Sequence, residues 1–137
     1  MPTVLLAEDA DLCRFPYATF LRRGGFDVCT AGDGDDALRV LRDRAADVVV
    51  LDLAMPRTDG TAVLRAMRAD PRWRDTPVVV ISALSERDVQ RRVAGLGVRA
   101  SLLKSRFTGR DLVRAVSECL APAGSVEPSP TAAGDSR

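Results

Sequence analysis

The sequence predicts an α/β fold: a doubly wound parallel sheet of five strands, in the order 2-1-3-4-5, with helices on both faces. Short aliphatic runs alternate five times with longer segments of helical periodicity. The clearest run, Val-Val-Val-Leu at 48–51, lies between Asp47 and Asp52, as a strand buried on both faces would. The connections are short, so each strand–helix–strand crossover should be right-handed.

The expected strands are runs of branched aliphatic residues bounded by polar residues, glycine or proline. Pro77 precedes the fourth run, and Gly24-Gly25 precedes the second. The expected strands are residues 3–7, 26–31, 48–51, 78–81 and 100–103.

Helices are expected between these strands because start and stop signals frame each segment. Asp11 can cap the first helix, in which Pro16 would cause a kink or mark the effective start. Ser85 and Thr108, each with an aspartate three residues on, form capping patterns. The expected helices are residues 12–23, 35–44, 61–69, 86–96 and 109–120. Their core-facing side chains should include Leu12, Phe15, Thr19, Phe20, Ala37, Leu38, Leu41, Val63, Leu64, Met67, Val89, Val93, Leu96, Leu112, Val116 and Leu120.

Length and composition predict one globular domain at 1–121, followed by a disordered tail at 122–137. The chain has 137 residues, of which 46% are hydrophobic and 28% charged. The tail is rich in Pro, Ala, Ser and Gly and has little to bury. No apolar run approaches the ~20 residues of a membrane span, and no signal-peptide pattern is present. We therefore expect a cytoplasmic protein without membrane contact.

Several classes of chemistry are excluded by the residue types. The chain has no histidine, which removes Ser-His-Asp and Cys-His catalysis, and its three cysteines form no C-x-x-C pair for zinc. Basic residues predominate in 85–120, but no nucleic-acid motif or aromatic platform accompanies them. We expect a protein partner there and no direct contact with nucleic acid.

Polar residues follow four of the expected strands. Glu8 and Asp9 come after the first, Asp52 after the third, Ser82 after the fourth, and Lys104, the chain's one lysine, after the fifth. Carboxyl ends of parallel strands meet at one edge, so these side chains should surround one crevice. Three carboxylates there favour Mg²⁺, and Asp52 could then attack phosphorus while Lys104 and Ser82 contact the phosphoryl oxygens.

Four motifs resemble the receiver domain of two-component response regulators, which has a flavodoxin-like fold. They are VLLAED, VVVLDLAMPRTDG, VVVISA and LLKS, and the resemblance covers about residues 3–121. It implies that Asp52 accepts a phosphoryl group from a sensor histidine kinase or phosphotransfer protein, with Ser82 and Lys104 contacting that group. It also implies Mg²⁺ bound by Glu8, Asp9, Asp52 and the main-chain carbonyl of Ala54. Such a protein is a signalling phosphoacceptor and not an enzyme with an external substrate.

Two positions depart from the family pattern. Ser105 follows Lys104 where the family has proline, so Lys104 could be aimed differently, and Ser101 stands where the family has its aromatic switch residue. A pseudo-receiver, an interaction module read without phosphorylation, therefore stays open as the alternative. A hydrolase of the haloacid dehalogenase type is disfavoured because Ala54 breaks its D-x-D pattern.

A basic surface is expected on the fourth helix, the fifth strand's approach and the fifth helix, where the family commonly displays its switching surface. Without the aromatic residue, phosphorylation should raise the affinity for a downstream partner only modestly. The arginines of this surface are Arg87, Arg91, Arg92, Arg99, Arg106, Arg110 and Arg114.

Overall fold

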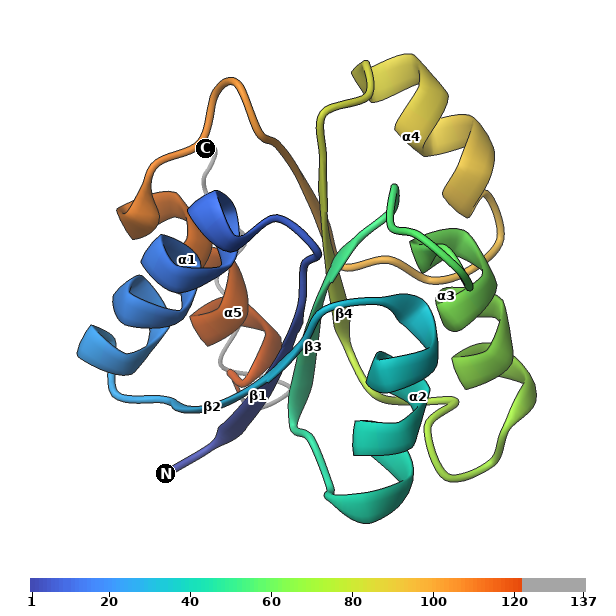
Figure 1. Ribbon diagram of the computed structural model, residues 1–137, viewed down its shortest axis with the longest axis horizontal. Coiled ribbons are helices and arrows are strands. Elements are labelled where there is room, and N and C mark those ends of the chain that lie inside the picture. The colour runs from blue at the N-terminus through green and yellow to red at the C-terminus, as the bar shows by residue number, and fades with distance from the viewer. Residues whose placement is uncertain (122–137) are drawn as a thin grey trace.

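Five strands and five helices alternate along the chain in the computed structural model, which describes residues 1–121 (Figure 1). The predicted disordered tail, residues 122–137, lies outside the described residues. The strands are β1 (Thr3–Ala7), β2 (Asp27–Ala31), β3 (Val48–Asp52), β4 (Val78–Ser82) and β5 (Ala100–Leu103). The helices are α1 (Asp11–Arg23), α2 (Gly34–Asp43), α3 (Gly60–Ala69), α4 (Glu86–Val93) and α5 (Gly109–Cys119).

The sheet is parallel throughout, and its order β2-β1-β3-β4-β5 confirms the predicted topology. In the middle of β1, Leu5 pairs with Cys29 of β2 on one side and with Val49 of β3 on the other. The chain therefore reverses its direction of travel across the sheet between β1 and β3. Such a reversal opens a crevice outside the carboxyl ends of the two strands.

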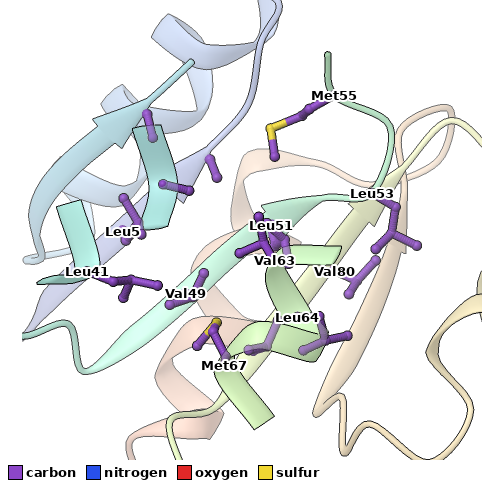
Figure 2. Close-up of a cluster of buried hydrophobic side chains, with 14 of the residues drawn as sticks. Leu5, Leu41, Val49, Leu51, Leu53, Met55, Val63, Leu64, Met67 and Val80 are labelled. Atoms are coloured by element: carbon purple, nitrogen blue, oxygen red, sulfur yellow. The ribbon is translucent and has the colours of Figure 1, made fainter. Parts of the chain in front are cut away.

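Two hydrophobic cores lie on opposite faces of the sheet, because successive side chains of a strand point to opposite sides. Helices α1 and α5 cover one face, and α2, α3 and α4 cover the other (Figure 1). On β1, Val4 and Leu6 belong to the first core, whereas Leu5 and Ala7 belong to the second. The second core also holds Leu41, Val49, Leu51, Val63, Leu64, Met67 and Val80 (Figure 2).

Most predicted boundaries agree with the structure to within one residue. Helix α4 is the main exception, because it ends at Val93 and not just before Gly97. Gly95 and Gly97 both have positive φ, of 77° and 68°, a conformation that stops a helix. Leu96 consequently packs against the core from the loop after the helix.

Helix α1 shows the one clear error in the predicted core. Leu12 is 91% exposed and Phe15 67% exposed, and Thr19 is exposed as well. Phe20 is 36% exposed, and its ring lies against Gly109 at the start of α5. The buried residues of the helix are Ala18 and Leu21. The stripe that turns toward the sheet is Arg14, Tyr17, Ala18 and Leu21, which has helical spacing but includes an arginine.

Helix caps distinguish α1 from the other helices. Asp33, Asp59, Ser85 and Thr108 each cap a helix with a side-chain oxygen, and the Thr108–Asp111 capping box is complete. The expected cap by Asp11 is wrong: Asp11 lies inside the helix, and the N-cap residue, Ala10, offers no side-chain bond. None of the helices described between residues 1 and 121 has the length and apolar character of a membrane-crossing span.

Candidate functional site

Strand register brings the predicted polar residues to one edge of the sheet. Ala7 pairs with Leu51, so Glu8 follows beside Asp52, and Ser82 pairs with Leu103, so Lys104 follows beside the end of β4. The N–H of Lys104 donates to the carbonyl of Ser82 at 2.8 Å, which extends the pairing by one residue. Four strand ends thus converge on the crevice at the switch point.

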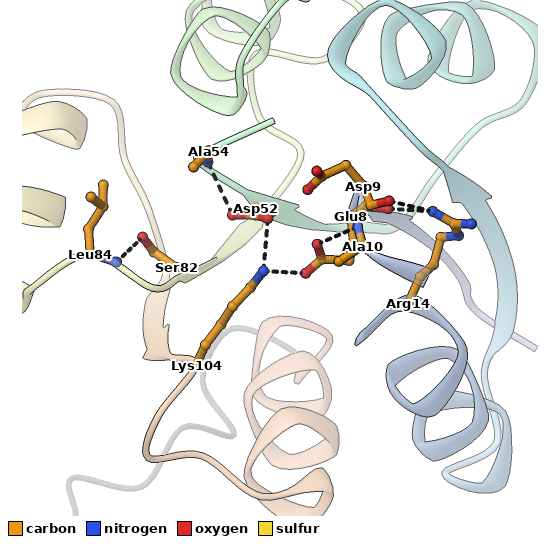
Figure 3. A network of polar contacts seen from close by, with 9 residues as sticks. All are labelled: Glu8, Asp9, Ala10, Arg14, Asp52, Ala54, Ser82, Leu84 and Lys104. Carbon is orange, nitrogen blue, oxygen red and sulfur yellow. Dashed lines mark hydrogen bonds and ion pairs between the residues drawn. The ribbon is translucent and has the colours of Figure 1, made fainter. Parts of the chain in front are cut away.

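Asp52 lies at the centre of this edge and is only 2% exposed. Its Oδ1 accepts the N–H of Ala54 at 3.1 Å, and its Oδ2 accepts the ammonium of Lys104 at 3.0 Å (Figure 3). Both carboxylate oxygens therefore have a fixed direction. A buried carboxylate held in this way has the geometry of a nucleophile or a metal ligand.

Lys104 also forms an ion pair with Glu8, whose side chain is fully buried. The Nζ of Lys104 lies 2.8 Å from Glu8 Oε1, and Glu8 Oε2 accepts the N–H of Ala10 at 3.1 Å. Burial raises the pKa of Glu8 to about 7, and the charge of Asp52 adds to the rise although Lys104 and Ala10 oppose it. Burial alone would lower the pKa of Lys104, but its bonds to Glu8 and Asp52 outweigh that effect and raise its pKa. The ammonium of Lys104 therefore pairs with two buried carboxyl groups, those of Glu8 and Asp52.

The carboxylates fit a magnesium ion. Glu8, Asp9 and Asp52 each present an oxygen, and these oxygens lie within 4.8 Å of one another, close to the roughly 4 Å across an octahedral Mg²⁺ shell. Glu8 Oε1 is buried and accepts no hydrogen bond, because Lys104 pairs with it by charge without hydrogen-bond geometry. Asp9 is exposed and faces the solvent from which an ion would come. An all-oxygen donor set, with one buried oxygen held only by an ion pair, suits Mg²⁺ better than zinc.

Ser82 flanks the site but is not joined to the acids. Its side chain is fully buried, and its Oγ accepts the N–H of Leu84 at 2.9 Å. The hydrogen bonds found among residues 1–121 include none between the Ser82 side chain and Asp52 or Lys104. Because Ser82 Oγ only accepts in this bond, its own proton stays free to donate to a group on Asp52.

The two departures from the family pattern have different outcomes. Lys104 reaches Asp52 at 3.0 Å, so the serine after it does not turn the ammonium away from the acid. Ser101 lies on β5 opposite Val80 and is half-buried. A small hydroxyl side chain occupies the position expected for the aromatic switch, so aromatic rotation cannot act there.

Arg14 is a residue near the site that the sequence analysis did not identify. Its guanidinium reaches back from α1 to the main chain of the acidic loop, where Nη1 lies 2.9 Å from the carbonyl oxygen of Glu8 and 3.3 Å from that of Asp9 (Figure 3). Position 14 follows Asp9 by just over one helical turn, and that spacing was the available signal. Arg14 was missed because the sequence prediction turned the wrong face of α1 toward the sheet.

Comparison with protein families matches residues 4–117 to the response regulator receiver domain. The match covers all strand residues except Thr3 of β1, and all but the last two residues of α5. It therefore includes all the residues of the site described above.

Two curated relatives come from Mycobacterium tuberculosis. Transcriptional regulatory protein PrrA is 40% identical over 129 residues, which cover 93% of this chain and 54% of PrrA. Transcriptional regulatory protein PdtaR is 36% identical over 114 residues, which cover 82% of this chain and 54% of PdtaR. The chain thus spans about half the length of the curated relatives it matches.

A solved structure has the same fold. It is the signal receiver domain of a signal transduction histidine kinase from Syntrophus aciditrophicus, with a TM-score of 0.81 and 26% identity. The alignment covers 96% of this chain and 99% of that one.

Proposed function

This chain belongs to the response regulator receiver domain family, and from that premise we propose that Asp52 accepts a phosphoryl group in a magnesium-dependent reaction. The observation that carries the proposal is the placement of Asp52: nearly buried, at a strand's carboxyl end, with Lys104 on one oxygen and two further carboxylates beside it. No glycine-rich phosphate loop accompanies it, so the acid itself is the group suited to phosphoryl chemistry.

The residues have separate tasks in the proposed transfer. Bound Mg²⁺ would neutralise the carboxylates and hold one phosphoryl oxygen, with Glu8, Asp9 and Asp52 as its side-chain ligands. A carboxylate oxygen of Asp52 forms the new P–O bond, while the P–N bond of a phosphohistidine breaks and its electron pair returns to the imidazole. Lys104 then pairs with a phosphoryl oxygen, and the Ser82 hydroxyl donates its free proton to another. The carbonyl of Ala54 remains the predicted main-chain ligand.

The chain acts in this proposal as a phosphoacceptor and not as an enzyme with an external substrate. It assists its own phosphorylation and also its own dephosphorylation, in which water attacks phosphorus, inorganic phosphate leaves and the Asp52 carboxylate is restored. We propose a sensor histidine kinase or a phosphotransfer protein as the donor, with the reaction in the cytoplasm.

The exposed apolar residues of α1 support a protein donor. Leu12 and Phe15 lie at the start of α1, directly after the acidic loop, and are 91% and 67% exposed. A protein that brings a phosphohistidine to Asp52 must cover the rim of the crevice, and these side chains would be buried by it. Phe15→Gln should slow transfer from a kinase several-fold and leave phosphorylation by acetyl phosphate unchanged.

A basic surface supports a downstream protein partner. All seven arginines predicted for α4, the approach to β5 and α5 are exposed. We propose that this surface binds an acidic patch of that partner, with an affinity that falls with salt and rises only modestly on phosphorylation.

The pseudo-receiver is the second candidate, and Ser101 is the observation that favours it. Without an aromatic side chain at that position, the site lacks the family's usual route from the Ser82 hydroxyl to the surface. A pseudo-receiver of this fold would carry a signal without phosphorylation.

Beryllofluoride with Mg²⁺ distinguishes the two candidates, because it mimics a phosphoryl group on a carboxylate. We expect the amide NMR signals of Ala54, Leu84 and Lys104 to shift when both are added, and to stay in place with Mg²⁺ and fluoride alone or in Asp52→Asn. Unchanged spectra of the wild type with both reagents would favour the pseudo-receiver.

A further inference from the structure

The carboxylates of the crevice differ in how they are fixed. Glu8 and Asp52 each accept a main-chain N–H and pair with Lys104. The side chain of Asp9 has no hydrogen bond or ion pair among the described residues and is exposed. Its position therefore depends on the backbone that carries it.

That backbone is held by Arg14. The Nη1 group donates to the carbonyls of both Glu8 and Asp9, at 2.9 and 3.3 Å (Figure 3). Nη2 pairs with the carboxylate of Asp11. The Arg14 side chain is only 19% exposed. The carbon Cζ lies 5.7 Å from the centre of the Phe15 ring, which shields it further. The planar guanidinium of Arg14 therefore binds three acceptor groups, all within residues 8–11.

The start of α1 has no side-chain cap to help hold this loop. Ala10, the N-cap residue, makes no side-chain bond, whereas α2, α3, α4 and α5 all have one. The loop from Glu8 to Asp11 is consequently held from inside the helix and not by a cap.

We propose that Arg14 is a positioning residue for the magnesium site: it fixes the main chain of Glu8 and Asp9 so that the Asp9 carboxylate is preformed as a ligand. This inference rests on the proposed function in one respect, that the ion is Mg²⁺. Lys104 bonds carboxylate oxygens that the ion would take over, so its contacts change when metal binds. Arg14 bonds carbonyl oxygens, so its contacts remain.

The direction in which the Mg²⁺ affinity changes when Arg14 is replaced separates a positioning role from a simple charge effect. A cation beside the site repels Mg²⁺, so if Arg14 acted only through its charge, removing it would tighten binding. If Arg14 acts by positioning, removing it weakens binding. Its pairing with Asp11 reduces its outward field, so positioning should dominate.

The experiment is isothermal titration calorimetry of Mg²⁺ into the wild type, Arg14→Met, Arg14→Lys and the control Arg23→Gln, far below the melting temperature of each. Arg23 is exposed in the last turn of α1, away from the crevice. We expect about tenfold weaker binding for Arg14→Met, an intermediate affinity for Arg14→Lys, and the wild-type value for the control. Equal or tighter binding by Arg14→Met would overturn the proposal, as would equal losses in Arg14→Met and the control.

Acetyl phosphate provides a second readout. At saturating Mg²⁺, Arg14→Met should be phosphorylated within about twofold of the wild-type rate, because Arg14 touches no reacting atom. A large loss at saturating Mg²⁺ would contradict a positioning role. If the wild type binds Mg²⁺ but is never phosphorylated, the proposed function fails while the calorimetric test of Arg14 still stands.

Discussion

Gly60→Ala should destabilise the protein although alanine is the better helix former. Gly60 begins α3, and its N–H donates to the carbonyl of Leu53 at 3.0 Å. A Cβ at this position would lie 2.1 Å from the carbonyl oxygen of Asp52 and 2.6 Å from the Cα of Leu53. An unstrained contact needs about 3.5 Å, so the start of α3 or the end of β3 would have to move by about 1 Å.

The expected size follows from two opposing effects. Gly→Ala gains about 0.4–1 kcal/mol by restricting the unfolded chain, whereas overpacking costs about 1–3 kcal/mol and sometimes more. The atoms met here belong to the backbone at the carboxyl end of β3 and cannot rotate away. We therefore expect a net loss of about 2 kcal/mol in the free energy of unfolding, together with slower phosphorylation of Asp52.

Urea denaturation followed by far-UV circular dichroism measures this loss. The matched control is Gly32→Ala, whose Cβ would meet only the Nη1 of Arg14 at 3.6 Å, an ordinary contact. The control should stay within about 0.5 kcal/mol of the wild type. If Gly60→Ala were as stable as the control, the close packing of α3 against β3 would be wrong.

Three further changes test other parts of the account. Lys104→Met leaves Glu8 and Asp52 without their cation, so it should lower the free energy of unfolding by about 3 kcal/mol at pH 8. The loss should be smaller at pH 6, where Glu8 can take up a proton, and urea midpoints at the two pH values would measure the difference. Because burial raises the pKa of Glu8 from 4.5 to about 7, the stability of the metal-free protein should fall as the pH rises from 4.5 to 7. The Mg²⁺ affinity measured by calorimetry should rise from pH 6 to pH 8, as Glu8 loses its proton. An affinity that does not change with pH would argue against Glu8 as a ligand. Arg68 donates to the carbonyls of Leu96 and Thr76 at 2.7 and 2.8 Å, far from the crevice. Arg68→Met should therefore lower the free energy of unfolding by about 2 kcal/mol and leave the Mg²⁺ affinity unchanged. A changed affinity would contradict the separation of the two regions.

The strands could be predicted from the sequence because their signal is simple. β1, β3 and β4 are short, mostly buried aliphatic runs with polar residues at their carboxyl ends, and a strand buried on both faces tolerates little else. β5 is a half-buried edge strand followed by Lys104. The carboxyl ends of these strands carry the acids and Lys104, so the meeting of these side chains followed from topology alone. The hydrogen bonds within the site could not be predicted, since they depend on rotamers: Ser82 turns to Leu84 and not to Asp52.

The bounds of α1 were predicted to within one residue, but its core-facing side was mispredicted because both faces of the helix carry apolar residues. Leu12, Phe15 and Phe20 are the larger side chains, and size suggested the core. The helix instead packs through small Ala18 and through Leu21, leaves Leu12 and Phe15 exposed, and sets the ring of Phe20 against Gly109 of α5. Tertiary contact settled the choice: the ring of Tyr17 lies 5.2 Å from that of Phe107, in the loop before α5. Arg14 lies on the same inner face as Ala18 and Leu21. It was overlooked because the prediction had turned the other face toward the sheet.

Intact mass spectrometry after incubation with acetyl phosphate tests the central claim, that Asp52 accepts a phosphoryl group with the help of Mg²⁺, most directly. The wild type should gain one phosphoryl group with Mg²⁺ and none when EDTA replaces the metal, and Asp52→Asn should gain none under either condition. Equal labelling of the wild type and Asp52→Asn, or labelling that is unaffected by EDTA, would contradict the account.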